Sequence, residues 1–389
     1  MKTICVFTSS RADYGILKPL LKLLKKNNNF NLQLLVSGMH LVPQYGNTIE
    51  EIEQDNFDIS AKVDILLASN TRSSVAKSIG IGLINYSDIL EKLKPDISIV
   101  LGDRFETFSF SIACHVLNIP LVHIHGGEIT EGAIDDGFRH SITKLSYLHF
   151  TSTEEYRQNV IQLGEEPFRV FNVGALAIDN IKNLVKLSRE EFEKRLGIKL
   201  KKYNFLITYH PVTLDKDLSK IQFSSILKAL DKFNDTLLIF TAANADPEGM
   251  KINDMIKDYT KNNTNKAIFI PSLGQFLYFN ALNFVDVIIG NSSSGIIEAP
   301  SFKIPTINIG DRQKGRTKAI SVIDSSYDTE EIYTKIKYAL SDDFQKICKS
   351  CVNPYGDGNS AKKIINILEN YSFDNIKKKF YKIRGNNLE

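Results

Sequence analysis

Short, nearly continuous runs of apolar residues recur along the first half of the chain and predict buried β-strands. These runs cover residues 4–8, 32–37, 97–101, 121–125 and 148–151. Runs of this length are typical of strands that are covered on both faces, as in a parallel sheet. Between them, apolar residues recur at three- and four-residue spacing, as in residues 16–24, and predict helices with one apolar stripe. The alternation predicts a doubly wound α/β fold.

The alternation pauses after residue 174 and restarts at residue 205. Further strands are predicted over residues 205–209, 236–241, 267–270, 285–289 and 305–309. We therefore expect two Rossmann-like domains, residues 1–174 and 175–365, with a cleft between them. A C-terminal helix over residues 366–389 is expected to pack back on the first domain, with lysines 377–379 on a solvated face.

Size and charge agree with this plan and point to a small partner. The chain has 389 residues, 43% of them hydrophobic, which exceeds what one hydrophobic core usually supports. Its formal net charge of +3 provides no broad basic surface for nucleic acid or for an anionic membrane. No segment resembles a secretory leader or a membrane span, so we expect a cytoplasmic protein.

Four cysteines are too few to indicate a disulfide framework. Cys348 and Cys351 form a C-x-x-C pair, but neither a second pair nor a thioredoxin-like strand accompanies it. A structural role for both thiols is therefore the favoured interpretation.

Polar residues that follow the predicted strands are the candidates for chemistry, because ligands of doubly wound sheets bind beyond the carboxyl ends of the strands. The first strand leads through residues 9–15 into a helix, whose free backbone N–H groups favour an anion, and Arg11 could add a positive charge there. Alternatively, Asp13 only caps this helix and Arg11 is a surface charge, an interpretation that has about equal weight.

Carboxylates and imidazoles crowd the ends of the next two strands of this half. Strand alternation predicts that His123 and His125 share one face and point with Glu128 toward the same rim as Asp103. A few residues later more polar groups follow, namely Glu131, Asp135, Asp136, Arg139 and His140. Such crowding separates pKa values, as acid–base chemistry requires. The H-x-H-x-x-E spacing also suits a metal ion, but no second cluster has a matching spacing, so we expect no metal.

A serine-rich loop in the second half predicts an anion site. Residues 290–295 read GNSSSG, and a helix carrying Glu298 is predicted to begin there, which would make a donor-rich nest for a diphosphate. Glu298 could accept both hydroxyls of a ribose. Arg312 and Arg316 follow the next strand as bidentate phosphate partners. His210 and Asn244, at two other strand ends, are expected on the opposite wall.

Together these motifs resemble the hydrolysing UDP-N-acetylglucosamine 2-epimerases of bacterial sialic acid synthesis. The main motifs are SRADYG (10–15), LGDR (101–104), HIHGGE (123–128), RHSITK (139–144), GNSSSG (290–295) and IGDRQKGR (309–316). Supporting motifs are SGMH (37–40), YGNT (45–48) and TSTEEY (151–156). The resemblance covers nearly the whole chain.

The resemblance implies a glycosyltransferase-B-like pair of Rossmann domains, the UDP-N-acetylglucosamine 2-epimerase fold. It implies conversion of UDP-N-acetylglucosamine and water to N-acetylmannosamine and UDP, the first step of sialic acid biosynthesis. In this family UDP is eliminated to leave a 2-acetamidoglucal, to which water then adds. No bound nicotinamide, other cofactor or catalytic metal is implied, and relatives are commonly homodimers or homotetramers.

The resemblance also implies roles for single residues. Asp103, Glu128 and Asp135 are acid–base candidates, and His125 and His210 complete the catalytic set. The animal relatives carry a glutamate where this chain has His125, so that role passes either to Glu128 or to His125 itself. Positions that match nucleotide contacts are Arg11, His210, Asn244, Ser292, Ser293, Glu298 and Arg312. Further substrate-binding candidates within the motifs are His40, Arg104, Arg139, Gly295 and Arg316.

Three alternatives stay open. One is a sister enzyme that hydrolyses GDP- or UDP-linked N,N'-diacetylbacillosamine in legionaminic acid synthesis. Another is a non-hydrolysing epimerase that returns UDP-N-acetylmannosamine. The third is a non-catalytic protein that binds a nucleotide sugar, although such a protein has no need for the crowd of carboxylates.

Overall fold

The computed structural model describes residues 1–43, 46–69, 71–130, 134–211, 218–243, 247–373 and 376–383. The chain forms two compact units, Met1–Asn180 with Tyr355–Glu389, and Ile181–Pro354. The first division falls inside helix α7 (Leu176–Lys182), later than the predicted boundary at residue 174. The chain returns to the first unit at Tyr355, earlier than the expected position of 366.

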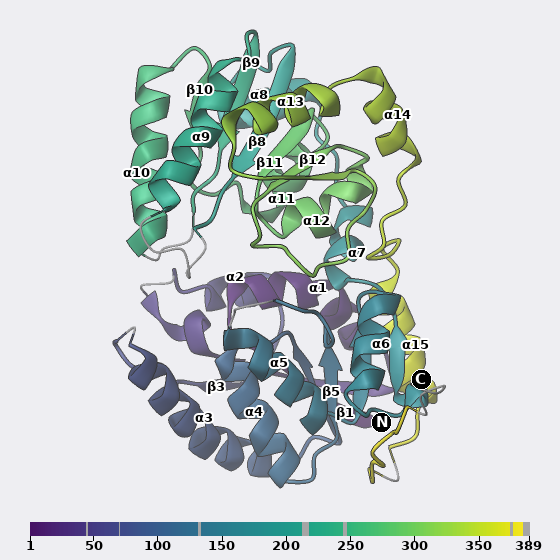
Figure 1. Cartoon of the computed structure of the whole chain (residues 1–389). Coiled ribbons are helices and arrows are strands. Elements are labelled where there is room, and N and C mark those ends of the chain that lie inside the picture. Colours follow the sequence, from purple (N-terminus) through teal and green to yellow (C-terminus); the bar gives the residue numbers. More distant parts are fainter. Residues whose placement is uncertain are drawn as a thin grey trace. The chain divides into compact units, whose positions relative to one another are not determined.

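The first unit is built on a parallel sheet of seven strands in the order β3-β2-β1-β4-β5-β6-β7. Figure 1 labels β1, β3 and β5 of this sheet. The strands are β1 (Lys2–Thr8), β2 (Phe30–Ser37), β3 (Ile59–Val63), β4 (Ile97–Leu101), β5 (Leu121–Ile124), β6 (Leu148–Thr151) and β7 (Val170–Asn172). Its helices are α1 (Arg11–Lys26), α2 (Ile49–Gln54), α3 (Arg72–Leu93), α4 (Phe105–Val116), α5 (Ile134–Leu145), α6 (Glu154–Gln162), α7 and α15 (Ser360–Asn370), with 3-10 turns η1 (Gly38–Leu41) and η3 (Pro167–Arg169).

Both faces of this sheet are covered, which explains the continuous apolar runs. Ile4 and Val6 of β1 belong to one hydrophobic cluster, together with residues of α1 and α15. Cys5 and Phe7, on the opposite face, belong to another cluster with residues of α3 and α4. Each residue of β1 from Ile4 onward is therefore buried.

The second unit repeats the plan with six parallel strands in the order β10-β9-β8-β11-β12-β13. The strands are β8 (Tyr203–Thr208), β9 (Thr236–Phe240), β10 (Ala267–Phe269), β11 (Val287–Gly290), β12 (Thr306–Ile309) and β13 (Val322–Ser325). Its helices are α8 (Arg189–Leu196), α9 (Ser219–Asp231), α10 (Pro247–Asn262), α11 (Gly274–Ala281), α12 (Ser294–Ile297), α13 (Thr329–Ala339) and α14 (Asp342–Ser350), with the 3-10 turn η4 (Ala299–Phe302). The predicted doubly wound fold is confirmed in both units.

Both sheets reverse their strand order at one point. The reversal lies between β1 and β4 in the first unit and between β8 and β11 in the second. Ligands of open α/β sheets bind just outside the carboxyl ends of the strands at such a switch point. The residues that follow these strands are therefore the candidate functional groups of each unit.

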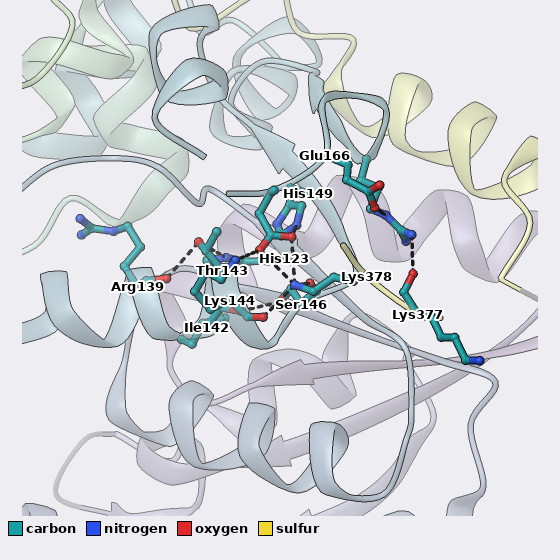
Figure 2. Close-up of polar contacts among 12 residues, drawn as sticks. His123, Arg139, Ile142, Thr143, Lys144, Ser146, His149, Glu166, Lys377 and Lys378 are labelled. Carbon is teal, nitrogen blue, oxygen red and sulfur yellow. Dashed lines mark hydrogen bonds and ion pairs between the residues drawn. The ribbon is translucent and has the colours of Figure 1, made fainter. Parts of the chain in front are cut away.

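The C-terminal tail differs from its prediction. Helix α15 ends at Asn370, and residues 371–373 and 376–383 have no regular secondary structure, so the predicted helix over 366–389 is wrong for those described residues. The tail lies along the first unit, where the Tyr381 N–H donates to the carbonyl of Gly164 at 2.9 Å. Arg169 donates to the carbonyl of Lys377 at 2.9 Å (Figure 2).

Lys378 is an inward-facing cation rather than part of a solvated helix face. Its Nζ donates to the carbonyl oxygens of Lys144 (2.7 Å) and Ser146 (2.6 Å) at the end of α5, and to Glu165 Oε2 at 2.9 Å (Figure 2). Burial alone would raise the pKa of Glu165, but hydrogen bonding from His149 and the charges of Lys378 and Lys144 lower it to about 2. The tail thus caps the carboxyl end of α5 with a charge that Glu165 neutralises.

The four cysteines are buried free thiols, and the Cys351 thiol contacts Ser321 Oγ at 3.6 Å. In the part of the chain that the structure describes, we find no helix whose length and apolar character would let it cross a membrane.

We expect Lys378→Met to lower the free energy of unfolding by about 2–3 kcal/mol, because it leaves two carbonyls and a buried carboxylate short of a donor. Lys379→Met, at the exposed neighbouring position, is the matched control and should stay within about 0.5 kcal/mol of wild type. Urea unfolding monitored by circular dichroism measures both values. Equal losses in the two variants would show that the contacts of Lys378 with the end of α5 and with Glu165 do not stabilise the fold.

Candidate functional site

A buried arginine organises the acidic cluster of the first unit. Arg139, on α5, is 4% exposed and forms an ion pair with Asp103, which follows β4. The other end of its guanidinium donates to Asp136 Oδ1 and to the Glu128 carbonyl, both at 2.7 Å. It also donates to Thr130 Oγ1 at 3.1 Å. One guanidinium therefore joins the ends of β4 and β5 to the start of α5.

The first turn of α5 places two more ionisable groups beside this arginine. Asp135 and Asp136 lie in that turn, and His140 Nε2 is 3.2 Å from Asp136 Oδ2. The pKa of Asp135 is raised, first because its carboxyl group loses water and second because the Asp103 carboxylate is nearby. The Asp135 carboxyl group is therefore closer to the protonated form than an ordinary aspartate.

Glu128 and His125 lie together at the end of β5. His125 Nδ1 is 3.6 Å from Glu128 Oε1, and Ser152 Oγ donates to the same oxygen at 3.1 Å. Both side chains are largely buried, with 12% and 8% of their side-chain surfaces exposed. His125 has a φ of 67°, in the left-handed region, so the chain has already left the strand at this residue. The structure thus brings these two predicted residues together.

His123 does not share the rim with His125, contrary to the prediction from strand alternation. Its ring is fully buried, with Nε2 2.8 Å from the Gly102 carbonyl and Nδ1 3.1 Å from Thr143 Oγ1. Thr143 in turn donates to the Arg139 carbonyl, as Figure 2 shows. Strand alternation does not extend to His125, because β5 ends at Ile124. His123 therefore supports the backbone beside Asp103 and α5.

The groups after β1 serve mainly as local structure. The Asp13 carboxylate accepts from the backbone N–H groups of Ser9 (2.9 Å), Ser10 (2.8 Å) and Tyr14 (2.7 Å), and Ser10 completes a capping box. Arg11 is exposed and pairs with Glu51 at 3.1 Å. In this structure the helix-cap interpretation therefore accounts for Asp13, and Arg11 lies at the surface with a weak partner.

His40 lies in the interior and Arg104 is partly exposed, both near the same sheet edge. His40 is fully buried between Thr8 (3.1 Å) and Thr48 (2.8 Å), and burial lowers its pKa. Arg104 binds both carboxylate oxygens of the buried Glu106, at 2.8 and 3.2 Å. Neither residue is presented as an isolated charge to solvent.

An asparagine that the sequence analysis did not single out holds the switch point of the second sheet. Asn291 follows β11, and its side-chain amide accepts from the His210 N–H and donates to the His210 carbonyl, both at 2.7 Å. Its own carbonyl accepts from Arg312 (3.0 Å) and Gln313 (2.8 Å). Asn291 and Gln313 lie inside the motifs GNSSSG and IGDRQKGR, and this was the sequence signal by which they could have been found. Asn291 thus joins the end of β8 to the loop that carries Arg312 and Arg316.

His210 and Arg312 are the two ionisable residues of this second cluster. The pKa of His210 is lowered to about 4, chiefly by burial and further by the Arg312 guanidinium. His210 is therefore neutral near pH 7, and the positive charge of the pair resides on Arg312. Arg316 lies four residues further along the same loop and is half-buried.

The serine loop differs from its predicted form. Helix α12 contains only Ser294–Ile297, and Glu298 lies at the junction with η4 rather than within a longer helix. A single turn has a weak macrodipole, so the predicted helix-end contribution to anion binding is small. Ser292 and Ser293 precede the turn as half-buried residues. Gly295 packs against β12, because a Cβ there would lie 2.7 Å from Thr306 Cγ2. Asn244 lies outside the described residues.

Comparison with known proteins decides the family. The family model described as UDP-N-acetylglucosamine 2-epimerase matches residues 22–369. The chain belongs to this family. It is therefore an enzyme of the epimerase group.

Three curated relatives match over most of their length. The GDP/UDP-N,N'-diacetylbacillosamine 2-epimerase (hydrolyzing) of Campylobacter jejuni is 44% identical, covering 86% of this chain and 88% of the relative. The polysialic acid biosynthesis protein P7 of Escherichia coli is 41% identical (95% and 94%). The UDP-N,N'-diacetylbacillosamine 2-epimerase (hydrolyzing) of Legionella pneumophila is 38% identical (95% and 96%). The predicted membership in the hydrolysing 2-epimerases is confirmed.

A solved structure agrees in fold. The UDP-GlcNAc 2-epimerase of Neisseria meningitidis bound to UDP-GlcNAc superposes with a TM-score of 0.81 at 19% identity, covering 95% of this chain and 100% of that one. The predicted glycosyltransferase-B-like fold of this family is confirmed. Within the described residues, no group of three or more His, Cys, Asp or Glu side chains is arranged to hold a metal ion.

The His123 ring makes the free energy of unfolding depend on pH. Burial lowers its pKa to about 3, whereas an unfolded histidine titrates near about 6.5. Between these values the unfolded chain binds the extra proton, so this contribution is present above about pH 6.5 and falls by about 1.4 kcal/mol per pH unit below it. Between pH 6 and 4, we expect the free energy of unfolding of His123→Gln, measured by urea titration, to change with pH by about 1.4 kcal/mol per unit less than that of wild type.

His115→Gln, at an exposed position of the same unit, is the control and should keep the wild-type pH dependence. A wild-type slope in His123→Gln would mean that the buried imidazole is charged.

Proposed function

We propose that this enzyme hydrolyses nucleotide-linked N,N'-diacetylbacillosamine and inverts C2, releasing 2,4-diacetamido-2,4,6-trideoxymannose and the nucleoside diphosphate. The observation that carries the proposal is that relatives with this named activity match at 44% and 38% identity over most of both chains. The N-acetylglucosamine donor predicted from the sequence is the second candidate. The 41% identity to a polysialic acid biosynthesis protein favours it.

The acidic cluster of the first unit is proposed to move the protons. A carboxylate removes the C2 proton while the C1–O bond breaks and its electron pair leaves with the diphosphate, which creates a C1=C2 double bond. Water then supplies oxygen to C1, and a proton reaches C2 on the opposite face. Two carboxyl groups with separated pKa values suit this sequence of steps.

Asp103 and Asp135 are the proposed pair. Asp103 is held in place by its ion pair with the Arg139 guanidinium, so we assign it the role of the base. Asp135 has a raised pKa, so it suits the acid. Glu128, held by Ser152 and near His125, is proposed to orient the water or the sugar.

The second unit is proposed to bind the leaving diphosphate. Expulsion of a diphosphate needs preorganised donors where negative charge develops. Arg312, fixed by its bond to the Asn291 carbonyl, supplies the charge, and Ser292 and Ser293 supply hydroxyls. Glu298 is proposed to accept the ribose hydroxyls, and a neutral His210 adds a donor without competing for the anion.

We expect UDP-linked N,N'-diacetylbacillosamine to be hydrolysed with a kcat/KM at least about tenfold above that for UDP-N-acetylglucosamine, because hydrophobic substituents typically discriminate by this factor. Free UDP measured over time by anion-exchange chromatography gives both rates, with GDP-linked donors run in parallel. A preference for UDP-N-acetylglucosamine would establish the second candidate instead.

Asp103→Asn tests the catalytic role of the Asp103 carboxylate. It should lose about a hundred- to ten-thousand-fold in kcat while UDP binding, measured by calorimetry, stays within about threefold. Tight UDP binding by wild type with no turnover of any donor would indicate a nucleotide-sugar binding protein.

A further inference from the structure

A cavity of about 540 Å³ opens at the carboxyl ends of β2, β3 and β4 in the first unit. Its volume lies in the range of about 300–1,000 Å³ that is common for small-molecule sites. The described residues after these three strands supply most of its wall, and the start of α3 closes one side. It therefore occupies the sheet edge where ligands of such folds bind.

One wall of this cavity is apolar and one carries hydroxyls. Leu66, Leu67 and Val75 provide much of the apolar side, and Met39 adds its thioether. Ser74 and Ser78, both buried, line the cavity from α3. A ligand end that carries methyl groups and one amide suits such a surface better than a ring end with several hydroxyls.

Arg104, which lines the cavity, is the sequence neighbour of Asp103 in the acidic cluster. It contacts Met39 Sδ at 3.4 Å. Its side chain is fixed by the Glu106 carboxylate, which is fully buried, and its charge acts on Asp135. Asp103 and Arg104 therefore link the acidic cluster to the wall of this cavity.

We propose that this cavity receives the C4-acetamido and C6-methyl end of a 2,4-diacetamido-2,4,6-trideoxyhexose donor and selects it over an unmodified hexosamine. This inference rests on the proposed function and names the residues that set its specificity. The C6 methyl packs on Leu67 and Val75, and the C4 amide meets the serine hydroxyls. The O6 hydroxyl of N-acetylglucosamine would lose water against the apolar wall without gaining a partner.

Val75→Thr tests this proposal because it keeps the shape of the side chain and adds one hydroxyl to the apolar wall. We expect the ratio of kcat/KM for the UDP-linked diacetamido sugar to that for UDP-N-acetylglucosamine to fall about tenfold. Leu67→Gln, at a residue that is 40% exposed, should act in the same direction without endangering the fold. Val116→Thr, at a 68% exposed position on α4, is the matched control and should keep the wild-type ratio.

The outcomes separate the two proposals. Hydrolysis of both donors with an unchanged ratio in Val75→Thr and Leu67→Gln would overturn the specificity cavity and leave the proposed activity standing. Failure of wild type to hydrolyse the diacetamido donor would overturn the proposed function, and the cavity assignment with it. A fall in the ratio caused by slower turnover of the diacetamido donor, with N-acetylglucosamine unaffected or improved, is the result that we predict.

Discussion

The buried guanidinium of Arg139 is the interaction on which the acidic cluster depends. It binds Asp103 beyond β4, the Glu128 carbonyl beyond β5 and Asp136 on its own helix, so three segments share one cation. A buried charge is tolerated only when its donors are satisfied, and removal of any one acceptor would leave the others misplaced. The geometry of the carboxylates is thus fixed by a residue that need not touch the reacting carbon.

The two units hold their functional groups in place with different interactions. Each places its functional groups where the strand order of a parallel sheet reverses. In the first unit a cation holds carboxylates, which suits proton transfer. In the second unit Asn291 holds the His210 backbone with its side-chain amide and accepts from Arg312 with its backbone carbonyl, which leaves a positive charge for an anion. This division of labour matches the proposed separation of acid–base chemistry from diphosphate binding.

The sequence predicted most of this arrangement because parallel strands buried on both faces leave strong local patterns. Strands β4 and β6 were predicted with their observed bounds. Strands β3, β7 and β13 were not predicted, because they are short, lie at sheet edges and are partly exposed, as Lys62 and Asp324 illustrate. The orientation of His123, the one-turn length of α12 and the inward position of Lys378 depend on contacts between distant segments, which no local pattern encodes.

The most direct test of the central claim, that carboxylates of the first unit exchange a proton at C2, is turnover in deuterated water followed by proton NMR of the released sugar. The account predicts one deuterium at C2 in every released sugar molecule and inverted stereochemistry at that carbon. A released sugar that keeps its original C2 proton would contradict the account, because the diphosphate would then have left without proton transfer at C2.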